Sequence, residues 1–211
     1  MRFLIKLGIL LNLIGFFGLF YWETELDKKA VKIDKAVKSL PSEEKALEYF
    51  LKKYERKWSA RDKQIFLQTI KAASKHYQID PFDLMTFVAL ESNYKITATS
   101  KPNSNGTRDF GLTQQNSNFY KTRYRIVSKV ADSYGLRYNS NNKFDIVLNV
   151  MSCSYFISSL RKEIKEKYGS VEKFQLIASY NTGIAGFKRY KKKAQQYYSV
   201  FQQLRSVSYD T

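Results

Sequence analysis

Hydrophobic and polar positions divide the chain into a long apolar segment and a series of amphipathic helices. Residues 7–22 carry no charged side chain, and extension back to residue 3 adds only Lys6. A helix needs about twenty apolar residues to cross a bilayer. Basic residues precede this segment and acidic residues follow it, so the positive-inside rule places the N-terminus in the cytoplasm. We therefore predict a single transmembrane anchor at residues 1–22, with everything after it outside the cytoplasm.

A cleavable signal peptide is the alternative for the same segment. However, no small-x-small cleavage site follows the apolar run, and no nearby cysteine could carry a lipid. We favour an uncleaved anchor.

Two amphipathic helices are predicted after the anchor. The first has a heptad-like apolar stripe at Leu26, Ala30, Ile33, Val37 and Leu40. Two heptads are too few to indicate a coiled coil. The second helix has Leu47, Phe50, Leu51, Tyr54 and Trp58 on one face. We assign both helices to a membrane-proximal stalk at residues 23–58, and residues 59–211 to the main domain.

Capping signals predict where the helices of the main domain begin. Ser59 forms a capping box with Asp62, which starts a helix that continues to about residue 77. Asp80 precedes Pro81, the typical order of an N-cap and a first helical residue. The other predicted segments are helices at 145–168, 174–180 and 194–207 and a long loop or small hairpin at 101–118. The predicted fold class is all-α.

Composition narrows the function classes. The chain is 44% hydrophobic with three prolines, which suits a folded domain, and its net charge is +17. Nucleic acid would attract such a charge, but the basic residues are scattered and no nucleic-acid-binding motif accompanies them. A polyanionic cell wall or an anionic membrane would attract it equally, and a solvated basic face is the plain alternative. We expect no specific nucleic-acid partner.

The chain has one cysteine and one histidine. A single cysteine, Cys153, excludes an internal disulfide and a cysteine-built zinc site. Cys153 lies in an apolar helical stretch, which favours a buried structural thiol. The single histidine, His76, has no partner for a Ser-His or Cys-His arrangement. We expect no metal and no cofactor.

Glu91 is the candidate for acid chemistry. Leu84, Phe87 and Val88 form the apolar face of the helix that begins at Pro81, and Glu91 continues that face. A carboxyl group on such a face is desolvated, which raises its pKa toward the range that a general acid needs. The alternative is a glutamate that turns into solvent, because the helix ends near Asn93.

Three segments resemble motifs of the lysozyme-like superfamily and of its soluble lytic transglycosylase domains. Residues 91–94 (Glu-Ser-Asn-Tyr), followed by Ala-Thr at 98–99, resemble the catalytic-glutamate segment. Residues 109–116, from Asp-Phe-Gly to Gln-Gln-Asn, resemble the substrate-binding turn. Residues 178–183 (Ala-Ser-Tyr-Asn-Thr-Gly) resemble the Tyr-Asn-x-Gly motif of the transglycosylases. The motifs occur in the family order, and the resemblance covers about residues 62–205.

The resemblance implies a lysozyme-like fold whose cleft binds the alternating N-acetylglucosamine and N-acetylmuramic acid of peptidoglycan. Glu91 is implied to protonate the glycosidic oxygen. In lytic transglycosylases the same glutamate then accepts the proton of the muramic acid 6-hydroxyl, which attacks C1 and leaves a 1,6-anhydro end. The implied substrate-binding residues are Ser92, Asp109, Gln114, Tyr180 and Asn181.

The resemblance also implies individual roles. Tyr180 is expected to hydrogen-bond and orient Glu91, the alternative being a packing residue among sixteen tyrosines. Gln114 and Asn181 are expected to bind sugar hydroxyl or acetamido groups. Gly111 and Gly183 fit turns that need positive φ or a close approach of the backbone to the sugar.

Positions 113 and 109 depart from the transglycosylase pattern, and the usual Pro after the turn motif is missing. Thr113 replaces a frequent methionine, which would alter an apolar wall of the cleft. Asp109 occupies a commonly uncharged position, whereas animal-type lysozymes begin this turn with their second catalytic aspartate. Two enzyme types therefore stay open: a lytic transglycosylase, which we prefer, and a lysozyme-type muramidase that uses Glu91 and Asp109. A non-catalytic wall-binding component is the third hypothesis.

The expected partners follow from these hypotheses. They are peptidoglycan glycan strands, the membrane through the N-terminal helix, and a secretion, conjugation or virion complex that opens the wall locally. The expected location is the inner membrane or a phage virion membrane, with the main domain on the periplasmic or cell-wall side.

Overall fold

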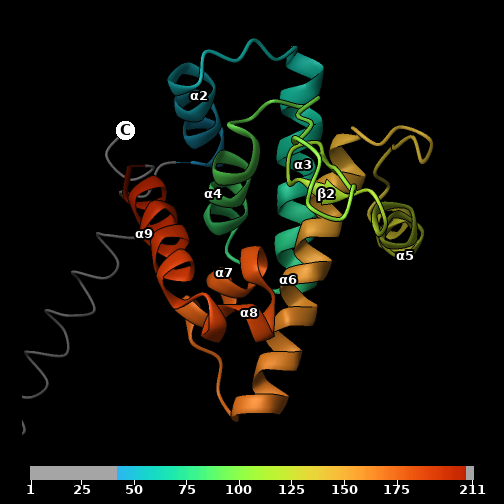
Figure 1. Ribbon diagram of the computed structural model, residues 1–211. Coiled ribbons are helices and arrows are strands. Elements are labelled where there is room, and N and C mark those ends of the chain that lie inside the picture. The colour runs from blue at the N-terminus through green and yellow to red at the C-terminus, as the bar shows by residue number, and fades with distance from the viewer. Residues whose placement is uncertain (1–41, 208–211) are drawn as a thin grey trace, which may run out of the picture. The chain divides into compact units, whose positions relative to one another are not determined.

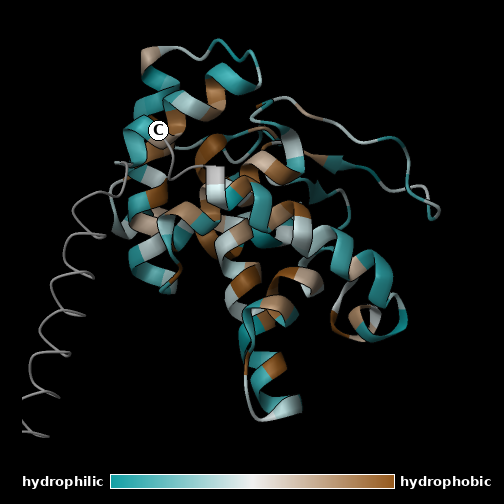
Figure 2. Cartoon of the chain, turned by 90° about the vertical axis from the view of Figure 1, so that its left-hand side faces the viewer, coloured by the Kyte–Doolittle hydropathy of each residue, from teal (hydrophilic) through white to brown (hydrophobic). Residues whose placement is uncertain are grey.

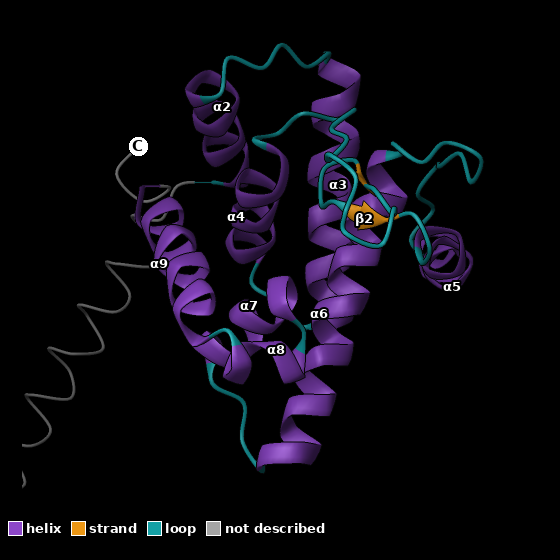
Figure 3. Cartoon of the chain, viewed as in Figure 1, coloured by secondary structure: helices purple, strands orange, loops and turns teal. Residues whose placement is uncertain are grey.

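The computed structural model describes residues 42–207, in which helices form the body of the domain and one short pair of strands lies on one side of it (Figure 1). The helices are α2 (Glu43–Lys53), α3 (Ala60–Tyr77), α4 (Pro81–Ser92), α5 (Tyr120–Ser133), α6 (Ile146–Tyr168), α7 (Lys173–Thr182), α8 (Ile184–Arg189) and α9 (Lys191–Val207). Strands β1 (Asp109–Phe110) and β2 (Gln115–Asn116) pair antiparallel. The predicted all-α class and the hairpin within residues 101–118 are confirmed (Figure 3).

Helix starts agree with the capping signals. Ser59 accepts a hydrogen bond from Asp62 N at 3.0 Å, and Asp80 accepts one from Phe82 N at 2.8 Å. Asp145 caps α6 in the same way. Each side chain satisfies a backbone N–H that has no partner within its own helix.

The long helix α6 organises the domain. Helices α3, α5 and α7 pack on α6, while α4 packs against α2, α3 and α9 (Figure 1). Apolar residues gather where these helices meet, and the outward faces are mainly polar (Figure 2). The hairpin packs on α6 through β2. These contacts bring the end of α4, the hairpin and α7 close to one another.

Helix α2 belongs to this domain and not to a separate stalk. Phe50 is fully buried and its ring stacks on that of Tyr94, with centroids 5.2 Å apart. Trp58 Nε1 also donates to Tyr94 O at 3.0 Å. The compact unit begins near residue 41, so the boundary predicted at residue 58 is wrong. The apolar face of α2 is buried against α4, which explains why the domain boundary lies before α2.

The predicted anchor at residues 1–22 and the apolar stripe at residues 26–40 lie outside the described residues. Between residues 42 and 207, no helix combines the length and hydropathy that crossing a bilayer requires.

Helices α5 and α8 carry no signal in the sequence that predicts them. Helix α5 has no side-chain N-cap and is rich in polar residues, and it buries only Tyr124, Val127 and Ala131. Those positions are spaced three and four apart, so one narrow stripe holds α5 to the domain. Helix α8 has six residues, too few for a periodic pattern.

Candidate active site

Glu91 lies in the last turn of α4, where apolar residues precede it and its side chain is half-buried. Burial raises the pKa of Glu91 to about 7, chiefly because the charged form loses its hydration. The hydroxyl of Tyr197 opposes this rise, and the negative charge of Asp109 adds to it. A carboxyl group with this pKa can give and take a proton near neutral pH.

Glu91 opens onto a cavity of about 270 Å³. The predicted residues Asp109, Gln114, Tyr180 and Asn181 also line this cavity. They come from β1, the hairpin turn and α7. Together with Glu91 on α4, they show that the fold brings three separate motifs to one cavity. Ser92 does not line the cavity. Its hydroxyl donates to Val88 O in the same helix at 3.1 Å, because it lies one residue further round α4.

Tyr197, which belongs to no motif of the sequence, contacts the glutamate directly. Its hydroxyl donates a hydrogen bond to Glu91 Oε1. Burial, followed by the nearby Glu91, raises the pKa of Tyr197 well above its usual range, so it remains a donor. The expectation that Tyr180 hydrogen-bonds Glu91 is wrong in this structure. Tyr180 instead donates to Thr113 O at 3.0 Å and thereby holds the hairpin turn to α7.

Asp109 faces the cavity but is held by two amides. Its carboxylate accepts hydrogen bonds from Asn116 Nδ2 at 2.8 Å and from Asn103 Nδ2 at 3.2 Å. Its backbone N–H donates to Ser100 Oγ at 2.9 Å. Both carboxylate oxygens therefore already have donors, which fixes the position of the group.

The hairpin turn lies against α6 through a glycine. Gly111 has φ +76°, as expected, and a Cβ there would lie 2.4 Å from Asn149 Nδ2. The close approach of the backbone at Gly111 is thus to the Asn149 side chain of α6. Asn149 Oδ1 accepts from Thr113 N at 3.2 Å, and Thr113 Oγ1 donates to Asn149 O at 3.0 Å. Thr113 is buried and contributes to this contact, not to a cavity wall. The positive φ expected at Gly183 is also confirmed.

Three residues of the cavity lie outside the motifs: Phe119, Arg123 and Phe156. The Arg123 guanidinium lies 4.3 Å from the centroid of the Phe156 ring, and its Nη1 donates to Gln115 Oε1 at 2.9 Å. Phe119 is 56% exposed, which leaves an aromatic face at the rim. A helix prediction at 120–133 would have placed Phe119 and Arg123 one turn apart on a common face.

Cys153 lies beneath the site as a buried thiol. Burial raises its pKa to about 12, while contact with Tyr180 acts in the opposite direction. A thiol with this pKa is protonated at neutral pH and is no nucleophile. Among residues 42–207, no cluster of three metal-ligating side chains could hold a metal ion.

The geometry agrees with a comparison to protein families. A family model described as "Transglycosylase SLT domain" matches residues 68–199, which is more than half of the chain. The match runs from α3 into α9 and includes Glu91, the cavity residues and Tyr197. A comparison with curated proteins finds no match. The chain therefore belongs to the transglycosylase SLT domain family, whose members are lytic transglycosylases that act on peptidoglycan.

Proposed function

We propose that the protein cleaves the β-1,4 bonds between N-acetylmuramic acid and N-acetylglucosamine and leaves 1,6-anhydromuramic acid ends. One observation carries this proposal. Glu91 combines a pKa of about 7 with a position in a cavity that holds polar and aromatic groups for a sugar. At pH 7 such a group is protonated in about half of the molecules, so it serves as acid and as base.

In the first step protonated Glu91 gives its proton to the glycosidic oxygen, and the bond from C1 of muramic acid to that oxygen breaks. The N-acetylglucosamine part leaves as an alcohol, and C1 acquires oxocarbenium character. Tyr197 donates to Oε1, so Oε2 is the oxygen that delivers the proton. The hydrogen bond also stabilises the carboxylate that remains.

In the second step the muramic acid 6-hydroxyl attacks C1. Its proton passes to the Glu91 carboxylate as the new C1–O6 bond forms, which restores the protonated acid. No water is consumed, and the product is an internal acetal that joins C1 and O6.

A lysozyme-type hydrolysis is the second candidate, because Asp109 lines the same cavity and its charge acts on Glu91. A retaining glycosidase needs a second carboxylate about 5 Å from the acid to attack or stabilise C1. We favour the transglycosylase because Asn116 and Asn103 already donate to the Asp109 carboxylate, which weakens it as a nucleophile.

Glycan contacts follow from the remaining groups. Gln114 and Asn181 offer amides for acetamido or hydroxyl groups, and Asn181 is exposed at the rim. Gln114 Nε2 donates to Gly111 O at 2.9 Å, which orients its amide. Phe119 offers an exposed ring to the apolar face of a sugar.

The proposal includes a place in the cell. We infer an anchor at residues 1–22 in the inner membrane or a virion membrane, with the enzyme on the wall side, serving local wall opening by a secretion, conjugation or virion complex. The support is the uncharged run at 7–22 and the basic residues before it. Protease added to intact cells and to spheroplasts tests this topology. The enzyme should be digested in spheroplasts, and digestion that occurs only after lysis would show the opposite topology.

Replacement of Glu91 tests the catalytic assignment. Glu91→Gln should reduce the release of soluble muropeptides by about a hundred-fold or more, because glutamine cannot transfer the proton. Glu163→Gln, an exposed position on α6, is the matched control and should leave the rate unchanged. If Glu91→Gln keeps a tenth or more of the rate, Glu91 is not the acid.

A further inference from the structure

The molecule has a second cavity that the proposed reaction does not use. Its volume is about 560 Å³, and its lining includes Tyr120, Lys121, Tyr124, Arg125, Ser128 and Asn141. We propose that this cavity binds the carboxylates of the peptide stems that peptidoglycan carries on its muramic acid residues. This inference rests on the proposed function, because it assigns a further part of the same substrate.

The second cavity adjoins the catalytic cavity at the start of α5. Phe119, the residue before α5, lines the catalytic cavity, whereas the next residue, Tyr120, lines the second one. The Tyr120 ring also contacts the ring of Phe110, with centroids 6.2 Å apart, and Phe110 directly follows Asp109. A polymer that lies in one cavity therefore brings its branches close to the other.

One hydrogen-bond network holds the two cavities in a fixed relation. Tyr124 belongs to the second cavity, and its hydroxyl accepts from Asn149 Nδ2 at 2.7 Å and donates to Lys143 O at 2.9 Å. The same Asn149 accepts from Thr113 N in the hairpin turn beside the catalytic cavity. The side chains of Tyr124, Asn149 and Thr113 are all buried, so neither cavity can shift far without the other.

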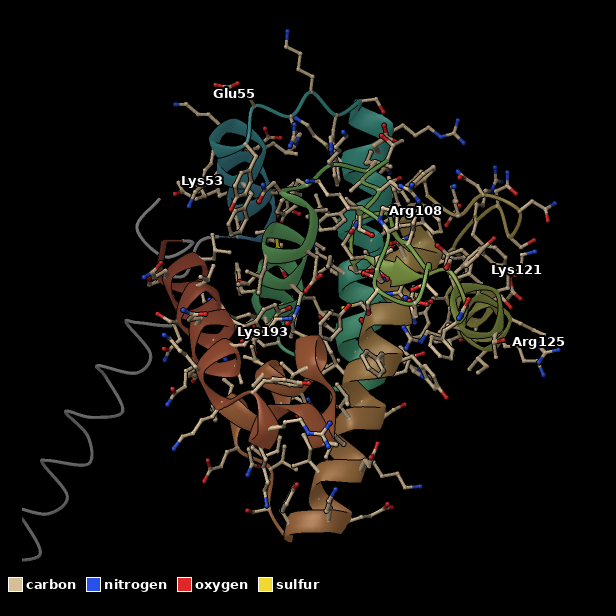
Figure 4. All side chains as sticks on the ribbon, in the orientation of Figure 1. Lys53, Glu55, Arg108, Lys121, Arg125 and Lys193 are labelled. Carbon is tan, nitrogen blue, oxygen red and sulfur yellow. The ribbon has the colours of Figure 1, made fainter. Side chains whose placement is uncertain are left out.

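The lining suits a flexible ligand that carries carboxylates and amides. Lys121 and Arg125 project outward from α5 into solvent (Figure 4), and no carboxylate belongs to the lining. Arg125 can bind a carboxylate through two parallel hydrogen bonds. Ser128 and Asn141 supply further donors and acceptors. Two carboxylates act on lining residues from outside the cavity: Asp132 on Tyr138, and Asp145 on Tyr124 and Tyr138.

Peptidoglycan offers one ligand of this chemistry. Its sugars are uncharged when the stems are attached, because each lactyl carboxyl group is then in an amide bond with the stem. The stems carry free carboxylates and branch from muramic acid, the sugar whose C1 is attacked. A stem that leaves the catalytic cavity past Phe119 reaches the start of α5.

Binding by an inactive protein separates this inference from catalysis. The full-length chain with Glu91→Gln is compared with the same chain that also carries Lys121→Ala and Arg125→Ala. The probes are soluble glycan strands with stems and strands from which an amidase has removed the stems. A stem-free strand keeps one lactyl carboxylate per muramic acid, so it controls for general attraction between opposite charges.

The double alanine variant should bind stem-bearing strands about three- to ten-fold more weakly, the size expected for two exposed ion pairs. Its affinity for stem-free strands should stay unchanged, and high salt should remove the difference on stem-bearing strands. Lys191→Ala with Lys192→Ala removes the same charge from exposed positions on α9 and should change neither affinity. Lys121→Arg with Arg125→Lys should retain most of the binding.

An equal loss on both strand types, an equal loss in the α9 control, or no loss at all would overturn the inference. These outcomes are independent of the proposed function, which fails only if the chain with an intact Glu91 releases no 1,6-anhydro product from either strand type.

Discussion

The hydroxyl of Tyr197 donates a hydrogen bond to Oε1 of Glu91, joining two residues that are 106 positions apart in the chain. Tyr197 lies in α9 and Glu91 in the last turn of α4, two helices that pack together. The contact orients the carboxyl group and, by stabilising its charged form, limits how far burial raises the pKa of Glu91.

Tyr197→Phe should therefore raise the pKa of Glu91 further. A hydrogen bond to a charged group contributes about 1.5–3 kcal/mol, which corresponds to about one to two pKa units. Activity depends on the protonated acid at the start of the cycle, so the alkaline limb of the pH–rate profile should move to higher pH. The maximal rate should fall because the carboxyl group loses its orientation.

Tyr198→Phe is the matched control for Tyr197. Tyr198 is also half-buried in α9, but its ring packs on Phe174, with centroids 5.2 Å apart. Its variant should keep the pH–rate profile of the unaltered protein. A Tyr197→Phe profile identical to that of Tyr198→Phe would show that the Tyr197 hydroxyl does not act on Glu91.

Glu91→Gln should also change how stability depends on pH. The carboxyl group binds its proton up to about pH 7 in the folded protein and loses it near 4.5 when unfolded. Unfolding thus releases a proton between these values, and the stability of the unaltered protein falls as pH rises through this window. The glutamine variant should be more stable by about 1–3 kcal/mol at pH 8, with the difference vanishing below pH 4.5. Denaturant melts at pH 8 and below pH 4.5 measure the free energy of unfolding of both proteins. The same difference between them at the two pH values would contradict the raised pKa of Glu91.

Tyr180→Phe should affect the hairpin turn more than the acid. Its hydroxyl donates to Thr113 O, and loss of that donor leaves this carbonyl with only the long 3.5 Å bond from Gln115 Nε2, at a cost of about 1 kcal/mol. We expect a lower melting temperature and a higher KM with an unchanged pH–rate profile. A shift of the profile as large as that of Tyr197→Phe would instead place Tyr180 in contact with Glu91 during catalysis.

Gly111→Ala should be more destabilising than Gly106→Ala, although both glycines have φ near +76°. Both variants incur the backbone cost of a left-handed alanine, about 1–2 kcal/mol. A Cβ at Gly106 meets nothing within 4 Å, whereas a Cβ at Gly111 would overlap the Asn149 amide. Overpacking should add about 1–3 kcal/mol at Gly111. Chemical denaturation compares the two, and equal losses would show that the contact with Asn149 can relax.

Local signals in the sequence were sufficient for the helix starts and for Glu91. Ser59, Asp80 and Asp145 cap helices through bonds to residues two or three positions away, and Glu91 continues a stripe within a single helix. A motif does not tell which neighbour of the glutamate faces the cavity, and the Ser92 hydroxyl bonds to Val88 O within α4. The domain boundary was misplaced because the amphipathic pattern of α2 does not identify what its apolar face packs against.

Long-range contacts could not be read from the sequence. Tyr197 is one of sixteen tyrosines, and only the packing of α9 on α4 singles it out. Arg123 and the second cavity depend on α5, which lacks a capping signal and buries only a narrow stripe. The contact between Gly111 and Asn149 likewise joins two segments whose proximity only the fold determines.

The chemical form of the muramic acid ends tests the central claim most directly. Purified peptidoglycan is digested with the unaltered protein and with Asp109→Asn, and the muropeptides are analysed by mass spectrometry. We predict products one water lighter than hydrolysed muropeptides and resistant to borohydride reduction, because C1 is held in a 1,6-anhydro bridge. Asp109→Asn should keep a measurable share of the activity and form the same products. Reducing ends from the unaltered protein, together with an inactive Asp109→Asn variant, would contradict this account and identify a hydrolase with a Glu91–Asp109 pair.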